Sequence, residues 1–121
     1  VVAVDEIERA VAALEAAGFR VERHAWSVNF QGRSQVSLQL STADFYRDFP
    51  IRSVPADVHG ILLRVAALED TLAGKIEAWQ IPECRRSKAI KDLGDIARLV
   101  ESHPQLRTLL PADVSDAIGG I

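Results

Sequence analysis

Two stretches in the second half of the chain decide the fold: LEDTLAGKIEAW at residues 68–79 and SKAIKDLGDIARL at residues 87–99. Apolar residues recur in the first stretch at steps of three and four, a spacing that predicts a helix over residues 67–80. The expected core positions of this helix are Leu68, Leu72, Ile76 and Trp79. Ser87 is expected to cap a second helix over residues 88–101. The expected core positions of that helix are Ile90, Leu93, Ala97 and Val100.

The same stretches carry charged residues at helical spacing. Asp92 and Asp95 are three residues apart and therefore share a helix face. Lys88 precedes Asp92 by four residues, and Lys91 precedes Asp95 by four. Lys75 lies on the preceding predicted helix, next to a core position. If the two helices pack antiparallel, Lys75 approaches one of the two aspartates.

Two interpretations of these charges are open. Lysine and aspartate four residues apart are most often surface pairs on a solvated helix, worth about 0.3–0.5 kcal/mol each, and charge spacing alone favours that interpretation. The alternative is an anion site, in which Arg85, Arg86, Lys88 and Lys91 lie near a helix N-terminus and bind a phosphate group.

The first half of the chain predicts a helix followed by strands. Apolar residues at helical spacing predict a helix over residues 4–17, and Gly18 is expected to end it. Residues 19–30 are rich in β-branched and aromatic residues and alternate between apolar and polar side chains from residue 26 onward. Residues 34–41 alternate again, and residues 31–33 form a short turn that contains a glycine. Two such runs predict an antiparallel hairpin.

The remaining segments complete an α+β chain. Residues 42–50 predict one or two helical turns, and Pro50 and Pro55 are expected to punctuate a loop. Val58 and residues 61–65 predict two short strands that bend at Gly60. Residues 61–63 are apolar on both faces, as in a covered strand. Short helices that begin with proline are expected over residues 104–110 and 111–118.

The order of helix, strands and then helices favours an α+β fold, with a small antiparallel or mixed sheet and a hairpin packed against helices, over a wound parallel sheet. We expect one domain over residues 1–121, with strands in residues 1–66 and C-terminal helices in residues 67–121. A length of 121 residues can bury a core. Neither internal repeats nor low-complexity segments divide the chain.

Composition excludes several classes of protein. The net charge of −3 gives no strong signal for nucleic-acid binding by bulk charge. No apolar run approaches the roughly 20 residues that span a bilayer, and acids near the start of the chain do not fit a signal peptide. The single cysteine, Cys84, excludes an internal disulfide and fits a reducing compartment, so we expect a cytoplasmic location. The three histidines and Cys84 do not have zinc-site spacing.

The segments 68–79 and 87–99 resemble the C-terminal part of nucleotidyltransferase-like proteins of the DNA polymerase β superfamily, near the AbiEii-type toxins. The shared pattern is Leu-Glu-Asp-x-Leu-Ala-Gly-Lys-x-x-Ala-Trp, a loop with arginine, and Ser-Lys-x-x-Lys-Asp-Leu-x-Asp-Ile-x-Arg-Leu. The earlier order of helix, Gly-Phe, strand, turn and strand is also similar to the middle of that family. The resemblance covers most of the chain, and its motifs are moderately specific.

The resemblance implies transfer of a nucleotidyl group with Mg²⁺ and a nucleoside triphosphate as cofactors. It places Lys75, Asp92 and Asp95 as catalytic residues on the far side of the active-site cleft. In the family, a Gly-Ser dipeptide holds the triphosphate and an Asp-x-Asp motif binds metal, and this sequence contains neither. The strand that would carry a third acid has Ser37 at that position, and serine is a poor replacement for a metal-binding carboxylate.

The upstream strand and helix of the family pattern are missing, and position 1 is not methionine. The chain is therefore expected to be either a piece of a longer enzyme or a shortened, degenerate relative. Ser37 favours the degenerate relative, because the loss of upstream residues would not replace an acid by serine at position 37. The sequence thus predicts a non-catalytic binding or assembly module that pairs with itself or with another protein. The alternatives are an active nucleotidyltransferase completed by a missing segment or partner chain, and a structural domain unrelated to nucleotides. A toxin–antitoxin role follows from family association only.

Other candidate residues have simpler interpretations. The three histidines are far apart in the sequence, and each is expected to be structural: His24 in a strand, His59 in a turn and His103 at the end of a helix. Cys84 is expected to be a plain reduced thiol. Trp26 and Trp79 are expected in the core or at an interface. A lid or contact patch is the expectation for Phe45, Tyr46 and Phe49.

Overall fold

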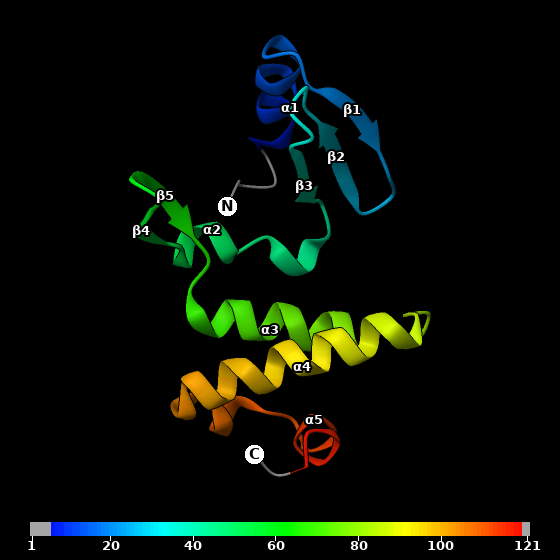
Figure 1. Cartoon of the computed structure of the whole chain (residues 1–121), viewed down its shortest axis with the longest axis vertical. Coiled ribbons are helices and arrows are strands. Elements are labelled where there is room, and N and C mark those ends of the chain that lie inside the picture. Colours follow the sequence, from blue (N-terminus) through cyan, green and yellow to red (C-terminus); the bar gives the residue numbers. More distant parts are fainter. Residues whose placement is uncertain (1–5, 120–121) are drawn as a thin grey trace. The chain divides into compact units, whose positions relative to one another are not determined.

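The computed structural model describes residues 6–119, and the α+β class is confirmed (Figure 1). The chain divides after Ala66 into two compact units, which we call the strand unit (described from residue 6) and the helical unit (described to residue 119). Each unit has its own hydrophobic core. That residues 1–121 fold as one domain stays a prediction.

The strand unit begins with helix α1, Ile7–Ala16. Its buried residues Ile7 and Val11 form a core with Val28 and Phe30 of the sheet. Gly18 adopts a φ of +96°, a conformation that glycine permits, and the helix ends there as predicted. The predicted start of this helix, at residue 4, lies outside the described residues.

The sheet has three antiparallel strands, β1 (Arg20–Arg23), β2 (Ser27–Gln31) and β3 (Ser37–Ser41), in that order. The prediction of a single strand over residues 19–30 is wrong. The chain reverses between β1 and β2, where the His24 N–H donates to the Ser27 carbonyl at 2.8 Å. Trp26 lies in this turn with 73% of its surface exposed, so of the two expected positions the core is wrong and an interface stays a prediction.

A short helical region follows, made of a 3₁₀ turn η2 (Asp44–Tyr46) and helix α2 (Phe49–Arg52). The next two strands, β4 (Val54–Val58) and β5 (Ile61–Val65), form a separate antiparallel hairpin. Pro55 therefore lies in a strand and not in a loop. His59 and Gly60 make the two-residue turn, with φ values of 51° and 83°.

The prediction that residues 61–63 form a covered strand is wrong. Ile61, Leu62 and Leu63 are 61%, 76% and 45% exposed. An apolar run indicates that a strand can be covered, but it does not supply the partner that covers it.

The helical unit contains α3 (Leu68–Trp79), α4 (Arg86–Ser102), a 3₁₀ segment η3 (Pro104–Leu109) and α5 (Ala112–Ala117). Helices α3 and α4 lie side by side and are joined by a short loop (Figure 1). The buried core residues are Leu72, Ile96, Val100, Leu106 and Val114. All four predicted core positions of α3 either belong to this core or pack against it.

Two details of α4 differ from the predictions. The helix begins at Arg86, its N-cap residue is Arg85, and no side chain caps it, so Ser87 is not the cap. Ile90 is 63% exposed, whereas Ile96, which the predicted core stripe omitted, is fully buried. No helix among the described residues is long and apolar enough to cross a membrane.

Candidate functional site

The side-chain amine of Lys75 joins the two packed helices of the helical unit. Its Nζ lies 2.8 Å from Asp95 Oδ2 and 3.6 Å from Asp92 Oδ1. Lys75 belongs to α3 and both aspartates belong to α4. The structure therefore brings together the three residues that the sequence resemblance placed on one side of a cleft.

Asp92 is the buried member of this group, with only 4% of its side chain exposed. In addition to its ion pair with Lys75, it accepts a hydrogen bond from Lys88 Nζ at 2.7 Å. Burial of a carboxylate costs several kcal/mol unless cations and donors compensate for it. Asp92 is therefore not part of a solvated surface pair, and that interpretation of its spacing with Lys88 does not hold.

Asp95 is surrounded by three cations. Its oxygens accept hydrogen bonds from Lys75 at 2.8 Å, from Lys91 at 3.0 Å and from Arg98. Hydrogen bonds hold the pKa of Asp95 well below its usual value: the bond from Lys75 has the largest effect, and the bond from Lys91 has the next largest. The hydrogen bond to Asp95 likewise raises the pKa of Lys75, and the charge of Asp92 adds to the effect. Lys75 and Asp95 are thus both charged at neutral pH.

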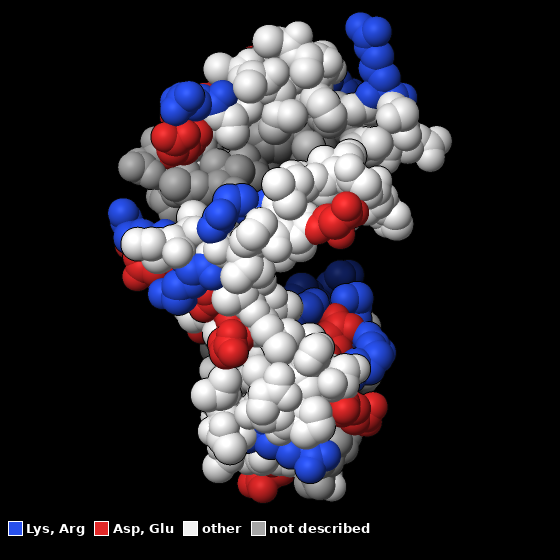
Figure 2. Space-filling view, turned by 90° about the vertical axis from the view of Figure 1, so that its left-hand side faces the viewer, with Lys and Arg blue, Asp and Glu red and all other residues white. Residues whose placement is uncertain are grey.

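The two aspartates and the four cationic residues that contact them form what we call the Lys–Asp cluster. Its members are Lys75, Lys88, Lys91, Asp92, Asp95 and Arg98. Four cationic groups face two carboxylates, so the cluster carries a surplus of two positive charges. Figure 2 shows the same mixture of signs on the face it displays, where acidic and basic side chains lie next to each other.

This donor set does not fit a resident Mg²⁺ ion. Magnesium prefers carboxylate and carbonyl oxygens in an octahedral arrangement, but the carboxylates of Asp92 and Asp95 are already bonded to ammonium and guanidinium groups. No group of three or more metal-ligating side chains occurs among the described residues. An anion fits the surplus charge better than a cation does.

A shallow groove of about 340 Å³ adjoins one side of the cluster. Its polar lining comes from Thr71 and Lys75 of α3 and from Asp95, Arg98 and Ser102 of α4, together with His103. The exposed ends of Lys88 and Lys91 do not line this groove; their side chains are 48% and 68% exposed. The cluster therefore presents cationic groups both in the groove and beside it.

The other predicted phosphate-binding residues lie farther away. Arg85 and Arg86 are at the start of α4 and are exposed. Arg86 precedes Asp92 by six residues, about 9 Å along the helix axis. Of the four predicted phosphate-binding residues, Lys88 and Lys91 belong to the cluster, whereas Arg85 and Arg86 flank it.

Sequence reasoning did not single out Arg98 as a site residue. Arg98 follows Asp95 by three residues, so the helical spacing that identified Lys91 also predicts this contact. Thr71 and His103 were not predicted as groove residues either. Their position depends on how α3 and α4 pack, which spacing within one helix does not determine.

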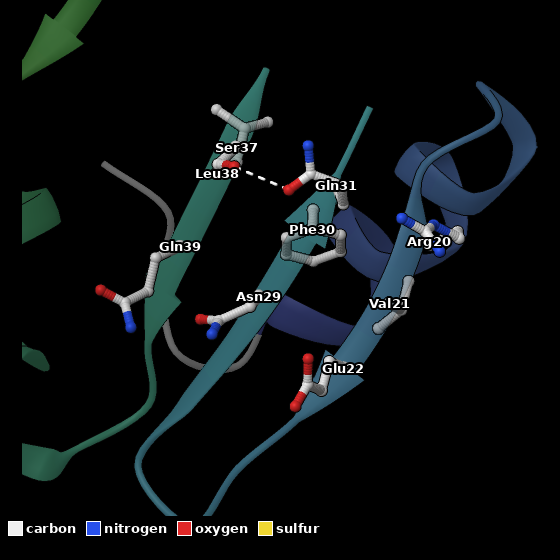
Figure 3. A pocket seen from close by; sticks show the side chains of 9 residues that line it. All are labelled: Arg20, Val21, Glu22, Asn29, Phe30, Gln31, Ser37, Leu38 and Gln39. Carbon is white, nitrogen blue, oxygen red and sulfur yellow. Dashed lines mark hydrogen bonds between the residues drawn. The ribbon is translucent and has the colours of Figure 1, made fainter. Parts of the chain in front are cut away.

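The strand unit has a second polar surface, on the face of the three-stranded sheet opposite α1. A pocket of about 720 Å³ lies over it, and Figure 3 shows its lining side chains. The strand register places Glu22, Asn29 and Gln39 in one row and Arg20, Gln31 and Ser37 in the next. Ser37, at the position where the resemblance expects an acid, donates a hydrogen bond to Gln31 Oε1 at 2.8 Å.

One atom on this polar face is unusual. The Asn29 Oδ1 atom is buried and has no hydrogen-bond partner among the described residues. A buried acceptor without a donor costs about 1–3 kcal/mol, so it favours a ligand or water that supplies an N–H or O–H group. No sequence signal singles out Asn29, because an asparagine in an alternating strand is an ordinary outward-facing residue.

Apart from His103, which lines the groove beside the cluster, the remaining candidates do not join either surface. His59 lies in the β4–β5 turn, and His103 follows the last residue of α4. Cys84 is a free cysteine in the loop before α4. Trp79 packs against the helical core, and the rings of Phe45, Tyr46 and Phe49 contact one another edge to face.

The structure is an α+β chain with a polar open sheet face in the strand unit and a lysine between two aspartates in the helical unit. Comparison with protein families matches residues 2–118 to the family described as "Nucleotidyl transferase AbiEii toxin, Type IV TA system". The chain belongs to this AbiEii family, which confirms the resemblance seen in the sequence. No curated protein and no solved structure matches the chain.

Proposed function

We propose that this chain is a non-catalytic binding module of the AbiEii family, and that its Lys–Asp cluster binds the phosphate groups of a nucleotide. The observation that carries the proposal is the position of Lys75 between Asp92 and Asp95, within a cluster that has two surplus positive charges. A lysine ammonium has three donors and an arginine guanidinium has five. The exposed Lys88, Lys91 and Arg98 therefore keep donors for phosphate oxygens.

The two aspartates have a positioning role in this proposal. Asp92 and Asp95 hold the three lysines in fixed directions, so little side-chain freedom is left to lose when an anion binds. The acids also keep the cluster from excessive self-repulsion while it is empty.

Two observations support the non-catalytic part of the proposal. The sequence has neither a Gly-Ser dipeptide nor an Asp-x-Asp motif, and it has Ser37 where the family pattern expects an acid. The carboxylates of the cluster, Asp92 and Asp95, are bonded to cations, and the described part of the chain holds no group of three or more metal-ligating side chains. The alternative is an active nucleotidyltransferase whose metal-binding part comes from another segment or a partner chain, and family membership favours keeping it.

A nucleotide titration tests the proposal. ATP, CTP, GTP and UTP are added separately, with and without Mg²⁺, while amide NMR shifts are recorded. We expect saturable shifts around residues 75, 88 and 92, and a Lys88→Ala, Lys91→Ala double variant should bind about tenfold more weakly. Arg107→Ala, which removes an exposed arginine of the same unit outside the cluster, is the matched control and should bind normally.

Either of two results contradicts the proposal. The first is the absence of shifts at nucleotide concentrations of about 10 mM, where even very weak binding is visible. The second is a loss of binding in Arg107→Ala as large as in the double variant, which would indicate non-specific charge attraction. Transfer of label from an α-phosphate-labelled nucleotide to protein or RNA would instead establish the active alternative.

The family's description as a type IV toxin–antitoxin component suggests a protein partner. We propose a toxin–antitoxin role for this chain on that basis alone. Growth of cells that produce the chain, with and without neighbouring genes, tests it. A non-catalytic module should not arrest growth by itself but should change the arrest that a neighbouring gene causes, whereas an active transferase should arrest growth by itself.

A further inference from the structure

The β4–β5 hairpin of the strand unit exposes an unusual amount of apolar side chain. Three consecutive residues of β5, Ile61, Leu62 and Leu63, are 61%, 76% and 45% exposed, and Val54 of β4 is 46% exposed. Single exposed apolar residues are normal on protein surfaces, but a contiguous group indicates an interaction surface. The hairpin is thus a candidate interface.

The two outer edges of the hairpin differ in their ability to accept another strand. Backbone groups of an antiparallel pair point alternately toward the partner strand and away from it. Counted from the two-residue turn at His59 and Gly60, the register places Pro55 and Arg64 in a pair whose backbone groups point outward. Proline has no N–H, so Pro55 interrupts the outer edge of β4.

The outer edge of β5 has no such interruption. In the same alternation, the backbone groups of Leu62 and Arg64 point away from β4, and both residues have an N–H to donate. Figure 1 shows no described strand beside this edge of β5. Strand addition is therefore feasible at β5 and hindered at β4.

We infer that a second copy of this chain occupies this edge: β5 pairs antiparallel with β5 of the other copy, across a twofold axis at Leu63. In this register Leu63 faces its own counterpart, Leu62 faces Arg64 of the other copy, and Ile61 faces Val65. All five residues of β5 are paired, and the outward groups of Leu62 and Arg64 bond reciprocally. A four-stranded sheet results, with the order β4-β5-β5-β4.

The charges of the hairpin fit its own copy. Residues 54–65 contain one acid, Asp57, and one arginine, Arg64. Cross-strand partners share a face, so Asp57, Leu62 and the Arg64 of the second copy lie on one face of the joined sheet. The backbone positions of Asp57 and that Arg64 are then two strand spacings apart, about 10 Å. The Arg64 guanidinium donates hydrogen bonds to Ser53 of its own copy, so its charge adds only a weak attraction to Asp57, which occurs twice by symmetry.

Shifted registers are less favourable. If the twofold axis moves from Leu63 to Arg64, Arg64 lies opposite Arg64 of the other copy, and like charges directly opposite each other destabilise a sheet. If the axis moves to Leu62 instead, Arg64 faces Gly60 of the other copy, which lies in the turn at a φ of 83° and cannot continue a strand. The other face of the joined strands carries Ile61, Leu63 and Val65 from both copies, so it is apolar throughout.

The expected dimer is weak. One strand pair with its side chains buries less than the roughly 1,200 Å² of a standard interface, so we expect a dissociation constant on the order of 10–100 µM. Sedimentation velocity of the 121-residue chain over a concentration series measures it. Leu62→Lys should weaken the dimer at least about tenfold, because it places a second cation beside Arg64 of the other copy.

Ile90→Lys is the matched control for this change. It replaces an aliphatic residue of similar exposure, 63%, on α4 of the other unit. It should leave the dimer unchanged. Circular dichroism of both variants establishes that each is folded.

Disulfide cross-linking tests the register. In the background Cys84→Ser, which removes the natural thiol, Leu63→Cys should form a disulfide-linked dimer under mild oxidation. Facing residues of a non-hydrogen-bonded pair have Cα atoms about 4.5 Å apart, within disulfide range. Leu62→Cys in the same background is the control: its two copies lie more than about 7 Å apart in this register and should cross-link much less.

Three results would overturn the inference. They are a monomer at every concentration up to about 0.5 mM, a dimer that Leu62→Lys does not weaken, and cross-linking through residue 62 in preference to residue 63. A monomer would assign the free edge of β5 to a different partner.

Discussion

Lys75 Nζ lies 2.8 Å from Asp95 Oδ2, although the two residues are twenty positions apart in the chain. This contact joins α3 to α4 by charge, beside the apolar core that joins them by packing. Because the partners stabilise each other's charged forms, the contact makes the stability of the helical unit sensitive to pH.

Acid should therefore destabilise the helical unit. The pKa of Asp95 is lowered in the folded chain, so the stabilisation is present above the unfolded pKa of about 4 and is lost as pH falls through the folded pKa. The pKa of Lys75 is raised, so its share is complete at neutral pH and is lost only in strong base. Urea unfolding between pH 7 and pH 2 should show falling stability below about pH 5.

A variant separates this effect from general acid unfolding. Asp95→Asn should reduce the pH dependence, whereas Asp116→Asn, at an exposed acid of α5, should keep it. Fluorescence of Trp79 in the background Trp26→Phe reports on the helical unit, because Trp79 packs against that core. If the free energy of unfolding falls equally with pH in wild type and Asp95→Asn, the Lys75–Asp95 contact does not contribute to the pH dependence. The hydrogen bond from Arg23 also lowers the pKa of Glu8, but this exposed pair belongs to the strand unit, which the Trp79 probe does not report on.

Replacement of the buried Asp92 should be costly. Asp92→Ala removes the acceptor of the Lys88 hydrogen bond and one of the two carboxylates near Lys75, and it leaves a small cavity. We expect a loss of about 1–3 kcal/mol in the free energy of unfolding. Lys91→Ala, which truncates a side chain that is 68% exposed, should change stability by no more than about 0.5 kcal/mol. Equal losses in both variants would mean that the burial of Asp92 is unimportant.

The same aspartate explains why the face of α4 was hard to predict. Asp92, Ile96 and Val100 are spaced by four residues and form the buried stripe of the helix. A search for apolar periodicity rejects a stripe that contains an acid and selects one that contains Ile90. The helix itself and its partner α3 were predictable because their apolar spacing is regular. The burial of Asp92 was not, because it depends on Lys75 from the other helix.

Other parts of the structure show the same division between local and non-local information. The end of α1 at Gly18 and the β4–β5 turn at Gly60 were predictable, because each has a glycine with positive φ. The turn at residues 24–27 contains neither glycine nor proline and was missed. In the candidate site, the pairs Lys88–Asp92 and Lys91–Asp95 follow from spacing within one helix. The contacts of Lys75 depend on the packing of two helices.

Core truncation should distinguish the true stripe of α4 from the predicted one. Ile96→Ala removes a fully buried side chain and should cost about 2–5 kcal/mol. Ile90→Ala removes one that is 63% exposed and should change stability by less than about 0.5 kcal/mol. Urea unfolding followed at Trp79 measures both. A larger loss for Ile90→Ala would show that α4 buries the other face.

Two glycines should respond to the same substitution with opposite signs. A Cβ atom on Gly32 would lie 2.9 Å from Cε1 of Phe19, whose ring packs against the core of the strand unit. Because that ring must shift to make room, Gly32→Ala should lower the free energy of unfolding by about 1–3 kcal/mol.

A Cβ on Gly94, within α4, would meet only the flexible end of Arg98 at 3.9 Å. Gly94→Ala should therefore stabilise the helical unit by about 0.5–1 kcal/mol, because alanine loses less backbone freedom in a helix. Urea unfolding measures both changes, with Trp26 as the probe for Gly32→Ala and Trp79 for Gly94→Ala. Stabilisation by Gly32→Ala would mean that the Phe19 ring moves aside without cost.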